Sequence, residues 1–220
     1  MKSYLFIIFS IFLSTSFAHK SKTKNAKIIE PITAQILKKY SESAAIKAQF
    51  IKTDLKKTLG IKNTNPGELQ YAEGKINISI SGEKKSEIIY NGNDLWVIEY
   101  PDLDFDPKAK RKVTEIQNHK PALAQQIIGL FQAPEIFIKN FKTVSEIVNG
   151  KMTTVRFESK DKAIQNFEVE FNTQKLLINS IQFTDDVQTQ THIEFKQTEF
   201  LKKADATLFE YKRKKDDEVM

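Results

Sequence analysis

The residues of this chain that could bind a metal are few and scattered. His19, His119 and His192 lie far apart in the sequence and lack the spacing of metal ligands. The chain contains no cysteine, so it has no thiolate nucleophile, no disulfide and no lipid-acceptor cysteine. We therefore expect neither a zinc site nor any other bound metal or cofactor.

Three alternating aspartates, Asp102, Asp104 and Asp106, look like the start of a calcium-binding loop. The glycine and the distal bidentate glutamate that such a loop needs do not follow at the right spacing, so we expect a solvated loop. The sequence also lacks a Gly-x-Ser-x-Gly motif, a phosphate loop and a dinucleotide fingerprint. No catalytic residue is identified, and we expect a protein that binds rather than an enzyme.

The charge balance is mildly basic, with 34 Lys and Arg against 28 Asp and Glu and a formal net charge of +6. An excess of this kind could favour acidic partners or anionic head groups, but a solvated lysine-rich surface is the explanation that we prefer. The basic clusters at residues 108–112 and 212–215 contain no interleaved aromatic side chains. We therefore do not expect a nucleic-acid partner.

The chain begins with a segment that resembles a secretory signal. After Lys2, residues 4–13 form an apolar run too short to span a bilayer, and residues 14–18 end in small side chains suited to signal peptidase. An uncleaved anchor is the alternative, but it would need a longer apolar core. We predict a cleavable signal over residues 1–18, which would export the chain from the cytoplasm, and one domain over residues 19–220.

The elements that would position a binding surface follow from two hydrophobic periods. Pro31, Ile36 and Tyr40 predict a helix with one apolar face, and a second apolar stripe after Pro121 predicts a short helix. Alternating apolar residues elsewhere, such as Ile76 and Ile78, predict about eight to eleven antiparallel strands, each buried on one side. A large sheet with so few helices must curve to cover its apolar face. The same residues would serve either as a filled core or as a hydrophobic cavity under a helical lid.

Several segments, in order along the chain, resemble the LolA family of periplasmic lipoprotein carriers. Residues 91–96, running to Tyr100 and Pro101, are similar to the family's Asp-Gly-x-x-Leu-Trp-x-Tyr-x-Pro segment. Gln49 and Phe50 end a strand as in the family's x-Phe-x-Gln opening. Residues 120–123 resemble its Asn-Pro-Leu lid segment, and residues 141–144, 167–169 and 208–219 match its later strands and C-terminal segment.

This resemblance implies a mainly β fold with some α structure. The fold is a single, strongly curved antiparallel sheet, an unclosed half-barrel covered by an N-terminal helix and a short helical lid. The implied function is a periplasmic chaperone, a monomer, that binds lipoprotein acyl chains and moves them from the inner to the outer membrane. Its implied partners are an inner-membrane lipoprotein-releasing transporter and an outer-membrane receptor. The residues predicted from periodicity to line the cavity and lid are Phe50, Leu69, Tyr71, Ile76, Ile78, Trp96, Ile98, Leu123, Ile127, Leu130 and Phe131.

The sequence departs from the family pattern at the position that fastens the lid. Glu73 and Gly74 replace the family's Arg-Pro, and a carboxylate cannot donate the hydrogen bonds that the arginine gives to the lid. Either the lid is held differently or the cargo differs. The same fold could also serve as a lipid- or lipoprotein-sensing regulatory module, because fold alone does not determine function. A hydrolase would need polar side chains that converge in the cavity.

Overall fold

The computed structural model describes residues 31–82, 85–116, 130, 141–159, 164–185, 187–215 and 217–220. The predicted signal at residues 1–18 lies outside the described residues, as do Leu123, Ile127 and Phe131 of the predicted lid. Leu130 is described; it is helical and fully buried. Among the described residues, no helix is both long enough and apolar enough to cross a bilayer.

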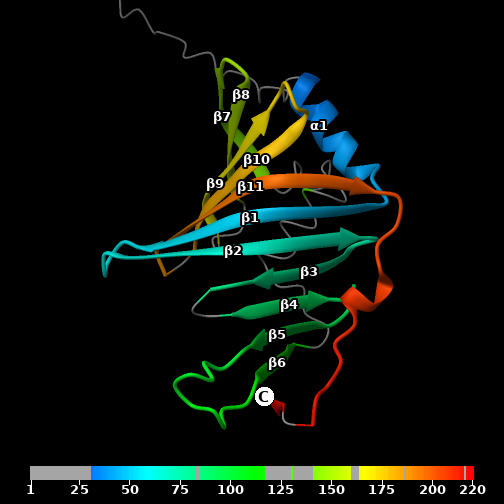
Figure 1. Ribbon diagram of the computed structural model, residues 1–220. Helices are drawn as coiled ribbons and strands as arrows, with labels where there is room; N and C mark the ends of the chain where they lie inside the picture. Colours follow the sequence, from blue (N-terminus) through cyan, green and yellow to red (C-terminus); the bar gives the residue numbers. More distant parts are fainter. Residues whose placement is uncertain are drawn as a thin grey trace, which may run out of the picture.

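One sheet makes up most of the described structure, with the strand order β12-β6-β5-β4-β3-β2-β1-β11-β10-β9-β8-β7 (Figure 1). Its strands are β1 (Ala45–Lys56), β2 (Ile61–Ala72), β3 (Lys75–Ile80), β4 (Ser86–Tyr90), β5 (Leu95–Glu99), β6 (Lys112–Ile116), β7 (Phe141–Asn149), β8 (Met152–Ser159), β9 (Ile164–Asn172), β10 (Leu177–Asp185), β11 (Thr189–Leu201) and β12 (Glu218–Val219). Most neighbours along this order are also neighbours in sequence. The exceptions are the pairs β1–β11 and β12–β6, which join distant parts of the chain.

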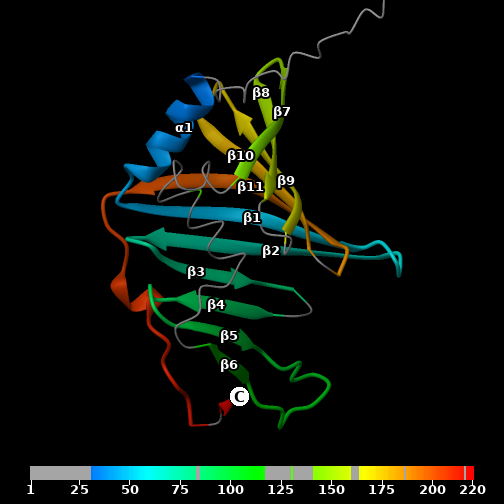
Figure 2. The same ribbon diagram turned by 180° about the vertical axis from the view of Figure 1, so that it is seen from behind.

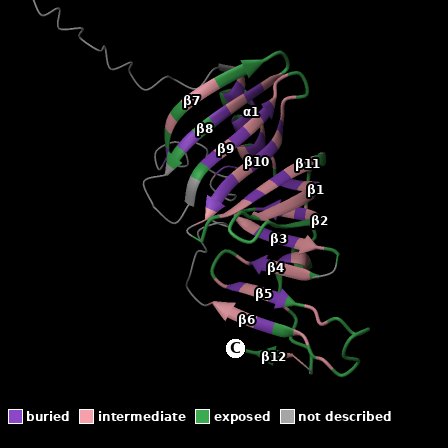
Figure 3. Ribbon diagram, turned by 90° about the vertical axis from the view of Figure 1, so that its left-hand side faces the viewer, coloured by how far each residue is buried: buried purple, intermediate pink, exposed green. Residues whose placement is uncertain are grey.

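The two long central strands hold the halves of the chain together. β1 pairs antiparallel with β11 from Ala45 opposite Leu201 to Lys56 opposite Thr189. β2–β6 extend from one side of this pair and β7–β10 from the other, and the whole sheet twists and curves (Figures 1 and 3). Within the described residues β7 and β12 end the sheet without pairing to each other. The predicted mainly β, curved and unclosed sheet is thus confirmed.

The concave face of the sheet carries one continuous apolar cluster. It contains residues from β1 through β11, together with Leu130 and the helix α1 (Pro31–Ser41). Ile36, Leu37 and Tyr40 of α1 are buried in it, and the helix lies over β10 and β11 (Figure 2). The predicted N-terminal helix is therefore confirmed, with Pro31 at its first position, where the missing N–H costs no hydrogen bond.

The C-terminal segment departs from the purely antiparallel prediction. After β11 it forms a short 3-10 helix, η1 (Ala206–Phe209), and runs past the ends of the strands to β12 (Figure 1). There β12 pairs with β6 in parallel, with Glu218 opposite Lys112 and Val219 opposite Val113. The segment between β11 and β12 crosses this half of the sheet before it pairs, so β12 can run in the same direction as the edge strand β6. A hairpin connection between two strands would instead force them to be antiparallel.

Candidate functional site

An aliphatic row crosses the concave face from β2 to β5. Leu69 pairs with Ile78, which pairs with Ile88, and Ile88 in turn pairs with Val97. Paired residues of neighbouring antiparallel strands share a face, so these four side chains lie side by side. Leu69 and Ile78 are buried, with 2% and 7% of their surface exposed, whereas Ile88 and Val97 are half-buried. The row therefore becomes more accessible toward β5.

A second row runs beside the first and contains two tyrosines. Tyr71 pairs with Ile76, and Ile76 with Tyr90. Tyr90 pairs with Leu95, which pairs with Ile116 of β6. The Tyr90 hydroxyl donates to the carbonyl of Gly92 at 2.7 Å, so its polar end is satisfied at the hairpin turn. The two rows together form an apolar surface that spans β2 to β6.

Phe50 extends this surface onto β1, and Gly67 makes room for it. The two residues are paired across β1 and β2. A Cβ atom on Gly67 would lie 2.3 Å from Cζ of Phe50 and 2.8 Å from the carbonyl oxygen of Ser79. Only glycine at position 67 lets the Phe50 ring cross the strand. The ring also meets Phe195 edge-on, with centroids 6.5 Å apart.

The other half of the concave face is aromatic and closed. Phe157, Phe167 and Phe171 are each 0–1% exposed. Phe167 lies 5.4 Å from Phe141 and 6.5 Å from Phe183, measured between ring centroids. Such ring pairs add to the free energy of simple area burial. This half of the face is a solid core, which is one of the two alternatives that the sequence left open.

Tyr40 fastens α1 to this half of the sheet. Its hydroxyl accepts a hydrogen bond from the backbone N–H of Ile178 at 3.0 Å. That N–H lies at a register shift between Ile178 and Ser180, where the pairing of β10 with β9 is interrupted. Burial raises the pKa of Tyr40 to about 12. The tyrosine thus satisfies a backbone donor that the irregular sheet leaves free.

Along β1 the concave face changes from apolar to charged. Lys52 pairs with Ile193, a member of the concave cluster, so its side chain lies on the same face. Its amine is 2.5 Å from a carboxylate oxygen of Asp54. The other oxygen of Asp54 accepts from the hydroxyl of Thr191 at 2.7 Å. A polar cluster of Lys52, Asp54 and Thr191 therefore borders the apolar surface at one end.

The structure brings six of the predicted cavity and lid residues into the concave cluster. They are Phe50, Leu69, Tyr71, Ile76, Ile78 and Leu130. The positions of Leu123, Ile127 and Phe131 lie outside the described residues. Sequence reasoning missed several half-buried members of the surface, although the alternation of their strands could have indicated them: Ile80, Ile88, Val97, Ile116, Phe195 and Phe200.

Trp96 and Ile98 do not line this surface, and their prediction is corrected. Both belong to a separate cluster with Ile89 and Val113 on the convex face. β5 is apolar on both sides, with Leu95 and Val97 in or against the concave cluster and the residues between them facing the other way. Residue type therefore does not reveal which side chains of β5 point to the concave face. The pairing of β5 with its neighbouring strands does reveal it.

The C-terminal segment covers the convex cluster and is locked there. The ring of Tyr211 stacks on Trp96 with centroids 5.5 Å apart. Arg111 donates two hydrogen bonds to Asp217, at 2.7 and 2.6 Å, and the Asp217 side chain is only 1% exposed. The Tyr211 hydroxyl and the Lys214 backbone N–H also donate to Asp217, each at 2.7 Å. We call Arg111, Tyr211 and Asp217 the C-terminal latch.

The electrostatics of the latch follow from these contacts. The hydrogen bonds from Arg111, together with those from Lys214 and Tyr211, hold the pKa of Asp217 well below its usual range. Burial, and then the donation to Asp217, raises the pKa of Tyr211 to about 12. Each shift favours the protonation states in which the latch is closed.

Glu73, the residue that replaces the family arginine, lies in the tight turn between β2 and β3. It is exposed and has a φ of 51°, and Gly74 follows with a φ of 77°. Two successive positive φ values are typical of a type I′ hairpin turn. Glu73 therefore lies in the turn beyond the ends of β2 and β3 and not among the apolar rows.

The family model for the outer membrane lipoprotein carrier protein LolA matches residues 41–212. The chain belongs to the LolA family. The match covers both apolar rows, the closed aromatic half and the polar cluster of Lys52, Asp54 and Thr191. Asp217 and β12 lie beyond the matched residues, so the C-terminal latch joins a matched residue, Arg111, to one outside the match.

The solved structures that match this LolA-family chain are distant from it in sequence. An uncharacterized conserved protein from Thermus thermophilus is 8% identical, with a TM-score of 0.49 over 86% of this chain and 99% of that chain. A LolA superfamily protein from Nitrosomonas europaea is 11% identical, with a TM-score of 0.41 over 81% and 97%. Among curated proteins no sequence matches. Membership of the family thus rests on the match to the family model.

Proposed function

We propose that this protein is a periplasmic carrier that holds the acyl chains of lipoproteins against the apolar rows of β2–β6 and moves them from the inner to the outer membrane. The observation that carries the proposal is the aliphatic row of Leu69, Ile78, Ile88 and Val97, which leaves an apolar surface half-buried beside a closed core. Large apolar surfaces that stay accessible mark binding sites. Membership of the LolA family supports the same reading.

The energetics suit an acyl cargo. Each buried methylene contributes about 0.8 kcal/mol, so one sixteen-carbon chain contributes on the order of 12 kcal/mol before the costs of binding. Unassisted release of such a chain into water would be prohibitive, so a carrier must cover it. The helix predicted at residues 121–131 would serve as the lid, and the burial of Leu130 in the concave cluster supports this role.

The polar cluster of Lys52, Asp54 and Thr191 gives the bound cargo a direction. An acyl chain has no hydrogen-bonding groups, whereas the ester and amide groups at its head do. We place the chain along the apolar rows and its polar head near the amine of Lys52 and the carboxylate of Asp54, where partners are available. A reversed chain would leave those half-buried polar groups facing hydrocarbon, which is costly.

Native mass spectrometry of the delipidated protein with a diacylated lipopeptide tests the proposal. The wild-type protein is expected to take up one lipopeptide. Ile88→Asp is expected to abolish uptake, because it places a charge in the middle of the aliphatic row. Ile147→Asp is the matched control, since Ile147 lies on β7 and is 62% exposed. Circular dichroism checks that both variants fold.

Two results would overturn the proposal. One is a wild-type protein that takes up no lipopeptide, and the other is equal uptake by folded Ile88→Asp and Ile147→Asp. If Ile88→Asp does not fold, Val97→Trp offers a second variant that fills the same surface without burying a charge. Acyl-chain uptake without transfer to acceptor vesicles would instead favour a lipid-sensing module.

A further inference from the structure

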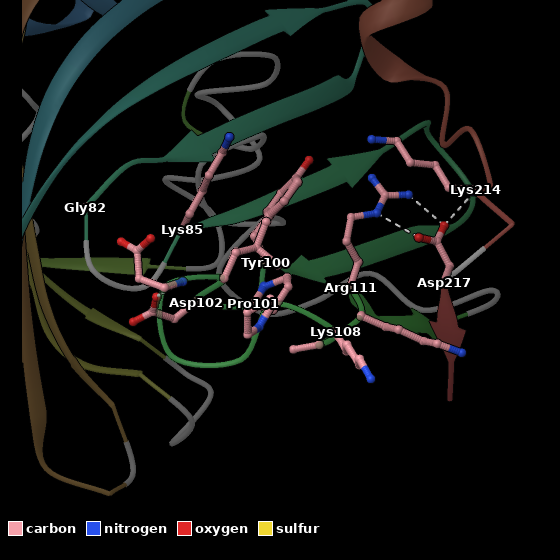
Figure 4. Close-up of a pocket in the computed structure, with 14 residues that line it drawn as sticks. Gly82, Lys85, Tyr100, Pro101, Asp102, Lys108, Arg111, Lys214 and Asp217 are labelled. Atoms are coloured by element: carbon pink, nitrogen blue, oxygen red, sulfur yellow. Dashed lines mark hydrogen bonds and ion pairs between the residues drawn. The ribbon is translucent and has the colours of Figure 1, made fainter.

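A pocket lies at the end of the sheet that carries the C-terminal latch, away from the apolar rows. It is formed by Gly82 and Lys85 before β4, by the loop at residues 100–111 between β5 and β6, and by Lys214 and Asp217 (Figure 4). Its volume is about 880 Å³. None of its lining residues belongs to the concave cluster, so it is a separate site.

The floor of the pocket is a tyrosine held between two cations. The amine of Lys85 lies 4.7 Å from the ring centroid of Tyr100, and the guanidinium carbon of Arg111 lies 5.7 Å from it. The Tyr100 hydroxyl donates to Glu87 at 3.0 Å. Arg111 is fixed in turn by Asp217 of the latch. Because these contacts hold the floor in place before any ligand arrives, binding needs little reorganisation there.

The charge that remains in the pocket is positive. Among the described residues, Arg111 and Asp217 neutralise each other, which leaves four exposed lysines against two aspartates and the Glu87 carboxylate at the Tyr100 hydroxyl. The lysines are Lys85, Lys108, Lys110 and Lys214. One oxygen of Asp102 is already used, since it accepts the backbone N–H groups of Asp104 and Phe105 at 3.0 and 3.4 Å. Lysine amines on flexible stems bind phosphate as point charges.

We propose that this pocket binds a phosphate-bearing anion, either the head group of an anionic phospholipid or a small soluble phosphate ester. The same loop favours the head group, because Leu103 and Phe105 project from it and are 57% and 91% exposed. Exposed apolar side chains next to lysines are typical of surfaces that rest on an anionic membrane. The site does not depend on acyl-chain binding.

Two probes separate the sources of the phosphate. Vesicles of phosphatidylcholine with and without phosphatidylglycerol test the membrane arm by cosedimentation, and glycerol 3-phosphate tests the soluble arm by calorimetry. We expect the protein to bind the vesicles that contain phosphatidylglycerol and to bind them less at high salt. Leu103→Ser with Phe105→Ser is expected to weaken vesicle binding and leave glycerol 3-phosphate binding unchanged.

Two double lysine variants, one in the pocket and one away from it, test whether the vesicles bind at the pocket. Lys108→Gln with Lys110→Gln is expected to weaken vesicle binding about 25-fold, at roughly fivefold for each lysine near an anionic surface. Lys57→Gln with Lys62→Gln removes the same charge from the exposed β1–β2 hairpin and is expected to change binding much less. Both pairs lie on exposed positions, so the fold is retained.

Each outcome decides the proposal. Binding of glycerol 3-phosphate alone supports the pocket and identifies a soluble ligand. No binding of either probe at low salt overturns the proposal, and so does an equal loss in the hairpin control. Ile88→Asp distinguishes this site from the acyl site, because it should abolish lipopeptide uptake while vesicle binding persists.

Discussion

The two halves of the concave face differ in side-chain type and in burial. On β8 and β9, Phe157, Phe167 and Phe171 are 0–1% exposed, and the rings of Phe157 and Phe167 pack against each other. On β4 and β5, Ile88 and Val97 of the aliphatic row are only half-buried. Rigid rings that stack on one another close a core, whereas flexible aliphatic side chains that are left accessible can repack around another chain. We therefore expect the aromatic half to hold the fold and the aliphatic half to bind the cargo.

A cavity in the aromatic half should destabilise the protein more than any other change considered below. Phe167→Ala should lower the free energy of unfolding by about 4 kcal/mol, because a large side chain leaves a cavity in a closed core. Urea denaturation measures the loss. The folded fraction should still bind lipopeptide with unchanged affinity. A parallel loss of affinity would mean that the two halves act as one surface.

Alkaline pH should weaken the attachment of α1 to the same half. The pKa of Tyr40 is raised to about 12, so between pH 10 and 12 the unfolded chain loses this proton while the folded protein keeps it. Stability that is present below pH 10 is therefore lost as the pH rises, by up to about 3 kcal/mol.

Tyr40→Phe checks the origin of this alkaline loss. The variant should be less stable at pH 8, since the N–H of Ile178 loses its acceptor. Its urea midpoint should then fall less steeply between pH 10 and 12 than that of the wild-type protein. Equal slopes would assign the alkaline loss to other groups, such as Tyr211.

A variant of the C-terminal latch tests how the C-terminal segment is held on the convex side of the sheet. Asp217→Asn should loosen the C-terminal segment by about 2 kcal/mol, because the hydrogen bonds to Asp217 are charge-assisted. The chain has a single tryptophan, so Trp96 fluorescence reports the loss of Tyr211 stacking. Asp104→Asn in the exposed loop is the control. If fluorescence and circular dichroism change together in urea, the segment is not a separate unit.

Acid should open the same latch in the wild-type protein. The pKa of Asp217 is lowered in the folded state, so its contribution is complete above about pH 4 and decreases as the pH falls below that value. Trp96 fluorescence recorded during an acid titration measures this change. Asp217→Asn should lack this part of the transition.

A variant in the aliphatic row should lose little stability but bind lipopeptide clearly more weakly. Ile88→Ala is expected to cost about 1 kcal/mol of stability, because Ile88 is half-buried, and to weaken lipopeptide binding roughly tenfold through lost methylene contacts. Ile147→Ala on the exposed face of β7 should change neither. Unfolding curves measure the stability of the two variants, and lipopeptide titrations measure their affinity. Phe167→Ala should show the opposite result, a large loss of stability with unchanged affinity.

Sequence patterns alone predicted most of the strands, the N-terminal helix and several residues of the apolar surface. The period-two pattern of Ile76 and Ile78 showed that they share a face, because side chains alternate along any strand. Pro31 and the stripe that follows it located α1. The ordered motifs identified the family, which the match over residues 41–212 confirmed.

Strand pairing in the folded protein was needed to establish which face of each strand is concave and which distant residues meet. Trp96 and Val97 are adjacent and both apolar, yet they lie on opposite faces. Arg111 and Asp217 are 106 residues apart, and their pairing depends on β12 reaching β6. Alternation is a local property of the backbone, whereas strand order and register arise from pairing across the whole chain. No local pattern could therefore reveal the latch, the pocket beside it or the closed aromatic half.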